Sequence, residues 1–133
     1  MSRHRRSSLH SLVSSCLMVG CALLAGCRGG HEAGGYEPGT GGNPANGKAL
    51  IQSYGCGSCH VVPGIRTARG LVGPPLLYYS RRTIIAGELP NSPDNLARWI
   101  ENPQAIEPET AMPNLGVSGD KARDMAAYLY TLR

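Results

Sequence analysis

This 133-residue chain contains no phenylalanine and a single tryptophan, whereas glycine contributes 18 residues and proline 10. Large apolar side chains make up most of the interior of a small domain, so this chain has little material for an ordinary hydrophobic core. The length allows one small domain besides any segment that is removed. We therefore expect one domain whose interior is completed by a large buried group.

Cysteine and histidine are both absent after residue 60. A structural zinc site needs four protein ligands, commonly from a second cysteine pair or a histidine pair farther along the chain, so Cys56 and Cys59 cannot begin one. A thioredoxin-like redox pair belongs to an alternating strand–helix pattern, and no run of β-branched residues precedes Cys56. These absences disfavour two common interpretations of a Cys-x-x-Cys pattern.

The remaining interpretation rests on the sequence Cys56-Gly57-Ser58-Cys59-His60, which has the attachment signature of c-type haem. Each thiol can add to a haem vinyl group as a thioether, and the adjacent imidazole becomes the proximal ligand of the iron. The small residues Gly57 and Ser58 let the backbone turn against the ring. The sequence therefore predicts one haem c, bound covalently through Cys56 and Cys59 and ligated by His60.

Net charge is small in the predicted mature chain, since residues 27–133 hold ten Lys and Arg against nine Asp and Glu. A nearly neutral protein is a poor candidate for binding nucleic acid. The charge is unevenly distributed: residues 28–82 hold six basic and two acidic side chains, and residues 83–133 hold four basic and seven acidic ones. Two solvated surfaces or a docking face would both explain this pattern.

Residues 1–26 are predicted to form a secretory signal of the lipoprotein type. Three arginines occur among the first six residues, and the apolar stretch at residues 12–24 is shorter than the about 20 residues of a membrane-spanning helix. The stretch ends in Leu24-Ala25-Gly26-Cys27, which resembles the lipobox of bacterial lipoproteins, whose cysteine is acylated and becomes the mature N-terminus. Ordinary cleavage near Ala25, which leaves Cys27 as a free thiol, is the alternative.

Residues 27–45 are expected to form a flexible tether, because seven of the eighteen residues at 28–45 are glycine. Its root-mean-square reach would be about 25 Å. A lipid on Cys27 would hold the following domain, residues 46–133, at a membrane on the periplasmic side of the bacterial envelope. His31 lies in the tether, and fixing it as a haem ligand would cost loop entropy.

Helix start and stop signals predict an all-α domain with three to four helices. The expected helices run from about residue 44 or 46 to 54, from 76 to 86, from 93 to 101 and from 118 to 132. Their expected caps and stops are Asn43 or Asn46, Gly55, Gly87, Ser92 with Pro93 after it, and Ser118.

Residues 46–133 resemble class I, monohaem c-type cytochromes, in which a few helices wrap around one covalently bound haem. The resemblance is carried by the Cys-x-x-Cys-His motif, by Gly73-Pro74, by Trp99 three residues before Asn102-Pro103, and by Met112-Pro113. From residue 87 on, the chain is most similar to the haem domain fused to subunit II of some bacterial cytochrome c oxidases. It lacks that subunit's two preceding membrane helices and its binuclear copper ligands.

The resemblance implies roles for single residues. Pro74 would offer its carbonyl to His60 Nδ1, although stiffening of the loop is an alternative role for this proline. Trp99 would pack on the haem, and Met112 would be the second axial ligand. Met125, the other methionine after the signal, belongs to an apolar stripe of the last helix and is expected to pack in the core.

Two further features follow from the resemblance. Arg81 and Arg82 are candidates to pair with the haem propionates, and two exposed arginines are the alternative. Tyr128 would pack the last helix against the first, near Gly47, where the missing side chain allows a close crossing.

With two axial ligands the iron has no open position, so we expect an electron-transfer protein and not an enzyme, without a small-molecule substrate. The expected partners are redox protein donors and acceptors of a respiratory chain, with a terminal oxidase as one candidate, and the membrane through Cys27. A fixed haem c subunit of a larger membrane redox complex is the alternative. A haem enzyme or gas sensor with a labile sixth ligand is a third reading.

Overall fold

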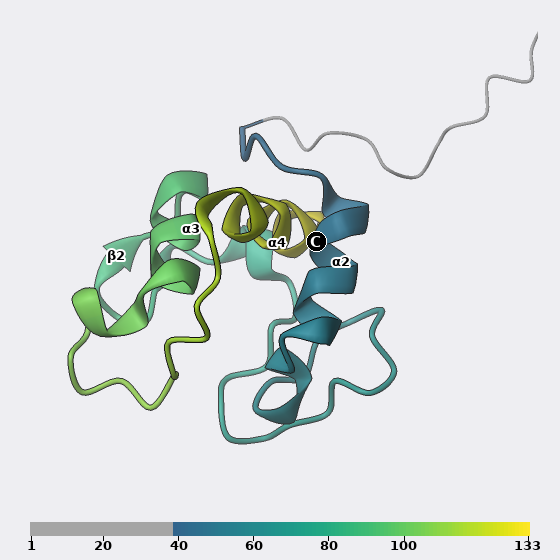
Figure 1. Ribbon diagram of the computed structural model, residues 1–133, viewed down its shortest axis with the longest axis horizontal. Helices are drawn as coiled ribbons and strands as arrows, with labels where there is room; N and C mark the ends of the chain where they lie inside the picture. The colour runs from purple at the N-terminus through teal and green to yellow at the C-terminus, as the bar shows by residue number, and fades with distance from the viewer. Residues whose placement is uncertain (1–38) are drawn as a thin grey trace, which may run out of the picture. The chain divides into compact units, whose positions relative to one another are not determined.

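The computed structural model describes residues 39–133. In chain order the elements are α2 (Pro44–Ser53), η1 (Cys56–Ser58), η2 (Tyr79–Arg81), β1 (Ile84–Ile85), β2 (Leu89–Pro90), α3 (Pro93–Glu101), η3 (Pro103–Ala105) and α4 (Gly119–Thr131). Three α-helices are joined by long loops, and the only sheet in the described part is one short hairpin (Figure 1). The predicted all-α class is confirmed. No helix in residues 39–133 is long and apolar enough to cross a bilayer.

Helix α2 begins and ends where the sequence indicates. The side chain of Asn43 accepts hydrogen bonds from the backbone amides of Ala45 and Asn46, at 2.9 and 3.3 Å, and so caps the first turn. Gly55 stops the helix in a left-handed conformation, with a φ angle of 72°. The chain can therefore turn sharply into the first cysteine.

Helices α3 and α4 also lie where they were expected. Ser92 caps α3 by accepting a hydrogen bond from the amide of Asn95 at 3.3 Å, and Pro93 occupies the first helical position. Helix α4 starts directly after Ser118, although the Ser118 side chain makes no capping bond to the helix. The position of a helix start was thus predicted even where its side-chain cap was not formed.

The helix expected over residues 76–86 is wrong. This segment holds the single turn η2 and the hairpin β1–β2, which pairs Ile85 with Leu89 in antiparallel register. The β-branched run of Thr83, Ile84 and Ile85 favours extended backbone over helix. Ala86 and Gly87 both adopt positive φ angles, of 53° and 85°, so Gly87 belongs to the hairpin turn and does not stop a helix.

Helices α2 and α4 cross at close range through Gly47. A β-carbon at this position would lie 1.9 Å from the backbone oxygen of Asp124, so no larger residue fits without moving a helix. Tyr128, farther along α4, is nearly buried and donates a hydrogen bond of 2.6 Å to the backbone oxygen of Pro63. The close crossing predicted at Gly47 is confirmed, and Tyr128 also anchors the loop that follows the cysteines.

Residues 39–43 are part of the folded unit, since Thr40 is only 2% exposed and the amide of Asn43 donates to the Asp124 carboxylate at 2.7 Å. The fold therefore begins before residue 46, where we expected the domain to start. The predicted signal, Cys27 and the tether up to residue 38 lie outside the described residues.

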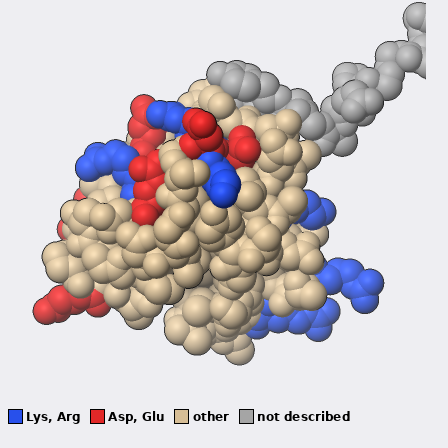
Figure 2. Space-filling model, viewed as in Figure 1, with Lys and Arg blue, Asp and Glu red and all other residues tan. Residues whose placement is uncertain are grey.

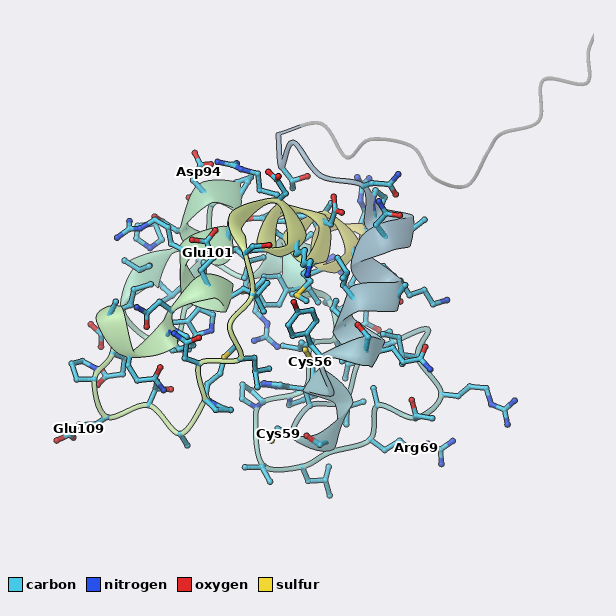
Figure 3. The ribbon with its side chains drawn as sticks, viewed as in Figure 1. Cys56, Cys59, Arg69, Asp94, Glu101 and Glu109 are labelled. Carbon is cyan, nitrogen blue, oxygen red and sulfur yellow. The ribbon has the colours of Figure 1, made fainter. Side chains whose placement is uncertain are left out.

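The charged side chains are segregated in space. Over α3 and α4 acidic and basic side chains are mixed, whereas only basic ones show beside α2 and toward the lower right of the molecule (Figure 2). The lower right is the region of the loop that carries Arg69 (Figure 3). The uneven charge along the sequence thus becomes an uneven charge across the surface.

Candidate cofactor site

A cavity of about 510 Å³ lies between the elements, within the usual range of small-molecule and cofactor sites. Its walls come from α2, α3, α4, the turn after α2, the hairpin and the loop before α4. Most of its lining is apolar, and the buried members include Ile51, Leu96, Ile100, Val117 and Leu129. An apolar cavity of this kind fits the large buried group that we expected from the scarcity of large apolar side chains.

Both cysteines line this cavity, Cys56 from the tight turn η1 and Cys59 from the residue that follows it. Both are labelled in Figure 3. The amides of Cys59 and His60 donate to the backbone oxygen of Cys56, at 3.2 and 3.0 Å, which holds the two sulfurs on one side of the turn. The cysteines are half-buried and do not form a disulfide. Burial raises the pKa of the Cys56 thiol, in contrast to the depressed values of redox-active cysteine pairs.

His60 is oriented by the hydrogen bond that we expected. Its Nδ1 lies 2.8 Å from the backbone oxygen of Pro74. A carbonyl oxygen only accepts, so Nδ1 carries the hydrogen, and in the neutral ring Nε2 keeps its lone pair for a metal. The ring fits because position 73 is glycine: a β-carbon there would lie 2.3 Å from His60 Cε1. Sequence reasoning used Gly73 as part of a motif but missed this steric role.

Met112 also lines the cavity, from the loop between η3 and α4. Its amide donates to Thr110 Oγ1 at 3.2 Å, and its carbonyl accepts from Gln104 Nε2 at 2.7 Å. Sequence reasoning missed both partners. A local hydroxyl-to-backbone bond could have been suspected for Thr110, two residues away, whereas no signal in the sequence connects Gln104 to Met112.

Met125 reaches the same cavity from α4, but it is only 1% exposed and belongs to the hydrophobic core cluster. Its expected packing role is therefore confirmed, although its sulfur is not remote from the site. Met112 is only partly buried and lies in the loop between η3 and α4. Assignment of the second axial ligand to Met112 stays a prediction.

The structure separates the two arginines. Arg82 lines the cavity, donates a hydrogen bond to the backbone oxygen of Pro75, and lies 5.0 Å from the centre of the Tyr79 ring. Arg81 is not among the lining residues and stacks over the exposed Tyr78 ring at 5.4 Å. Arg82 is therefore the better placed of the two to meet a carboxylate at the site.

Trp99 is half-buried and lines the cavity from α3. Asn91 does not line the cavity, but it holds two residues that do. Its Nδ2 donates hydrogen bonds to the backbone oxygens of Arg82 at 2.9 Å and Tyr79 at 3.3 Å. The Asn91 side-chain oxygen in turn accepts from Tyr130 of α4 at 2.9 Å. Sequence reasoning identified Trp99 and missed Asn91.

The residues present fit a haem c. Two thiols on one turn, an imidazole with a free Nε2 and a thioether sulfur all border one mainly apolar cavity, and an arginine and a tryptophan also line it. A thioether and an imidazole are common axial ligands of haem iron. Cys56, Cys59, His60 and Met112 would hold the group, with Pro74 orienting His60.

Comparisons with known proteins agree with this chemistry. Residues 44–133 match the family model described as Cytochrome c. The chain is 33% identical over 88 residues to "Cytochrome c oxidase subunit 2" of Alkalihalophilus pseudofirmus, a match that covers 65% of this chain and 25% of the relative. The chain thus spans only a quarter of the length of that relative.

Proposed function

Because the chain belongs to the cytochrome c family and is accordingly an electron-transfer cytochrome, we propose that it carries single electrons between redox proteins of a respiratory chain. In each cycle it would take one electron from a reduced donor protein and pass that electron to an oxidised acceptor protein. No atom is transferred. The haem c implied by the family supplies a one-electron Fe(III)/Fe(II) couple.

One observation carries the proposal: the cavity is bordered on one side by His60, with Nε2 free to bind a metal, and on another by Met112. The Pro74 carbonyl keeps the ring of His60 oriented and raises the basicity of its free nitrogen. Gln104 and Thr110 hold the backbone on both sides of Met112. If His60 and Met112 both bound the iron, a substrate would have no place to bind, which favours electron transfer over catalysis.

We place the protein in the bacterial envelope, on the periplasmic side of a membrane and anchored by a lipid on Cys27. The basis is the Leu24-Ala25-Gly26-Cys27 sequence after a basic and an apolar stretch. Residues 27–38 are not among the described residues, so this part of the proposal rests on sequence pattern alone.

A second candidate is a fixed haem c subunit of a larger membrane redox complex, and the relative favours it, because that protein is by its printed name a subunit of cytochrome c oxidase. The same likeness makes a terminal oxidase a candidate acceptor for a freely moving carrier. Mild detergent extraction distinguishes the two. Recovery as a lone monomer supports the carrier, and stable co-purification with other subunits supports the fixed subunit.

The electron-transfer chemistry is tested by an optical redox titration of the haem-loaded protein, combined with exposure of its reduced form to carbon monoxide. We expect one reversible one-electron transition and no change of spectrum with carbon monoxide over minutes. Rapid and complete carbon monoxide binding would show an open or labile sixth position, and it would support a haem enzyme or a gas sensor in place of a carrier.

A further inference from the structure

The segment Pro74–Pro75, in the loop after the cysteine turn, determines where the His60 imidazole points. The Pro74 carbonyl accepts from His60 Nδ1 at 2.8 Å, so the orientation of the ring depends on the position of this carbonyl. A proline has no amide hydrogen, so each of the two residues can join a backbone hydrogen bond only through its carbonyl. Both prolines are exposed, and packing therefore restrains them little.

Arg82 holds the next carbonyl of the same segment, because its Nη2 donates a hydrogen bond to the backbone oxygen of Pro75. The amides of Gly73 and Leu76, one on each side of the prolines, donate backbone hydrogen bonds of 2.8 Å. These two bonds fix the ends of the segment and leave its two carbonyls to side chains. In the described part of the chain, those side chains are His60 and Arg82.

Arg82 is itself firmly held at both ends. Its amide donates to the Tyr79 oxygen at 3.1 Å, and its carbonyl accepts from Asn91 Nδ2 at 2.9 Å. Its guanidinium lies over the buried Tyr79 ring, and Asn91 is in turn bonded to Tyr130 of α4. A side chain that is already ordered can position another group at little cost in entropy.

We propose that Arg82 is a positioning residue for His60. By holding the Pro75 carbonyl, it keeps the adjacent Pro74 carbonyl within reach of His60 Nδ1. The inference rests on the proposed function, because the orientation of the imidazole affects electron transfer only if His60 binds the iron. It deepens that function by assigning a residue that adjusts the midpoint potential through the backbone.

This role differs from that of a cation beside an acidic group of the cofactor, and the two predict opposite changes of the midpoint potential. A hydrogen bond from Nδ1 to a carbonyl makes the imidazole more basic, and a more basic ligand favours oxidised iron. Loosening the bond between His60 and Pro74 should therefore raise the potential. Loss of a nearby positive charge would lower it, because a cation favours the reduced iron.

The test compares two variants of the haem-loaded protein with one matched control. Arg82→Met removes the donor and the charge at similar length, whereas Arg82→Lys keeps the charge and replaces the planar donor group with a flexible ammonium. The control is Arg81→Met, because Arg81 is the exposed neighbour and stacks over the Tyr78 ring in a similar way, at 5.4 Å.

The first measurement is the rate at which the His60 Nδ1 hydrogen exchanges with deuterium, followed by nuclear magnetic resonance in the reduced protein. We expect exchange to be about tenfold faster in Arg82→Met and about threefold faster in Arg82→Lys. The control should change by less than about twofold. The amides of Gly73 and Leu76 and the urea unfolding curve should change little, because backbone bonds hold the ends of the segment.

The second measurement is an optical redox titration. Arg82→Lys keeps the positive charge, so a change of its midpoint potential reports on His60, and we expect the potential to rise. The potential of Arg81→Met should stay in place. If Arg82→Met attaches no haem, Arg82→Lys alone decides by the same two measurements.

Unchanged Nδ1 exchange in the Arg82 variants would overturn the proposal. Together with a lower potential in Arg82→Met, it would assign Arg82 to charge alone. Equal acceleration of Nδ1 and of the Gly73 and Leu76 amides would also overturn it, because Arg82 would then hold the loop as a whole. Absence of a reversible one-electron transition in the unchanged protein would instead contradict the proposed function itself.

Discussion

The two sides of the cavity are built by different means. On the His60 side, backbone-to-backbone hydrogen bonds link the cysteine turn to the loop after it, through Gly57 with Gly70, Cys59 with Gly73, and Val61 with Leu76. On the Met112 side, side chains hold the backbone, from Gln104, Thr110 and Asn114. No backbone-to-backbone hydrogen bond is found for residues 111–117 in the described part of the chain.

This difference in hydrogen bonding predicts how each side of the cavity responds to a substitution. Backbone hydrogen bonds persist when a side chain is changed, whereas a side-chain hydrogen bond is lost with its residue. The His60 side should therefore fail only when a substitution forces the backbone apart. On the Met112 side, each substitution of a supporting side chain should remove one hydrogen bond. We expect it to speed the binding of external ligands such as cyanide, with little effect on the free energy of unfolding.

The largest effect is expected from forcing the His60 side open with Gly73→Ala. The new β-carbon would lie 2.3 Å from His60 Cε1, so the ring or the loop must move. We expect unfolding in urea to show a loss of about 3 kcal/mol, and a low yield of protein with covalently attached haem.

Gly119→Ala is the matched control, because the nearest atom to its β-carbon is the flexible Glu101 carboxylate, at 3.1 Å. A Gly73→Ala protein with the stability and haem content of the control would contradict the tight fit of the imidazole.

On the other side, Met112→Ala should lower the midpoint potential by a few tenths of a volt, because a thioether ligand favours the reduced state. The measurement is an optical redox titration. Met125→Leu, a change of nearly constant volume, should leave both potential and spectrum in place. A shift with Met125→Leu and none with Met112→Ala would reverse the assignment of the axial ligand.

A smaller effect is expected when the support of Met112 is removed and its sulfur is kept. Gln104→Ala deletes the donor to the Met112 carbonyl, whose hydrogen bond of 2.7 Å contributes about 1 kcal/mol. Cyanide should then bind to the oxidised protein about fivefold faster, with little change in unfolding. The exposed Gln52→Ala variant serves as the control, and equal rates in the two variants would show that Gln104 does not restrain Met112.

The smallest effect should come from Tyr128→Phe. This change removes the hydrogen bond that the Tyr128 hydroxyl donates to the backbone oxygen of Pro63 on the His60 side. At pH 7 we expect a loss of about 1 kcal/mol in urea unfolding. Burial raises the pKa of Tyr128, so the folded state keeps this proton at a pH where the unfolded state loses it.

The contribution of Tyr128 to the stability of the unchanged protein is therefore constant below a pH of about 10 and falls above it. Because phenylalanine cannot ionise, the difference between the two proteins should narrow when unfolding is repeated above that pH. A difference that stays constant would show that folding does not raise the pKa of Tyr128.

What the sequence predicted well was local. Asn43, Ser92 and Gly55 define helix ends by bonds or turns within a few residues, and all three occupy the predicted positions. The cysteine turn and the hydrogen bond between His60 and Pro74 were expected from short motifs. The close crossing at Gly47 followed from a family pattern and not from periodicity.

What the sequence did not predict depends on contacts across longer separations. The segment after Pro75 was expected to be a helix, yet Asn91, Tyr130 and Leu132 fasten it as a turn and a hairpin against the end of α4. Gln104 acts on a residue eight positions away. Neither set of contacts leaves a periodic signal, because each bond depends on a single side chain that meets a distant part of the chain.

The segment at residues 39–43 has a mechanical consequence. The amide of Asn43 is bound to Asp124, and Gly42 lies so close to α4 that a β-carbon there would be 2.2 Å from the Arg123 oxygen. A force applied at Gly39 would therefore be borne by the junction of α2 and α4. The cysteine turn lies at the other end of α2, so the contacts of Asn43 and Gly42 with α4 would take up the load before it reaches the turn.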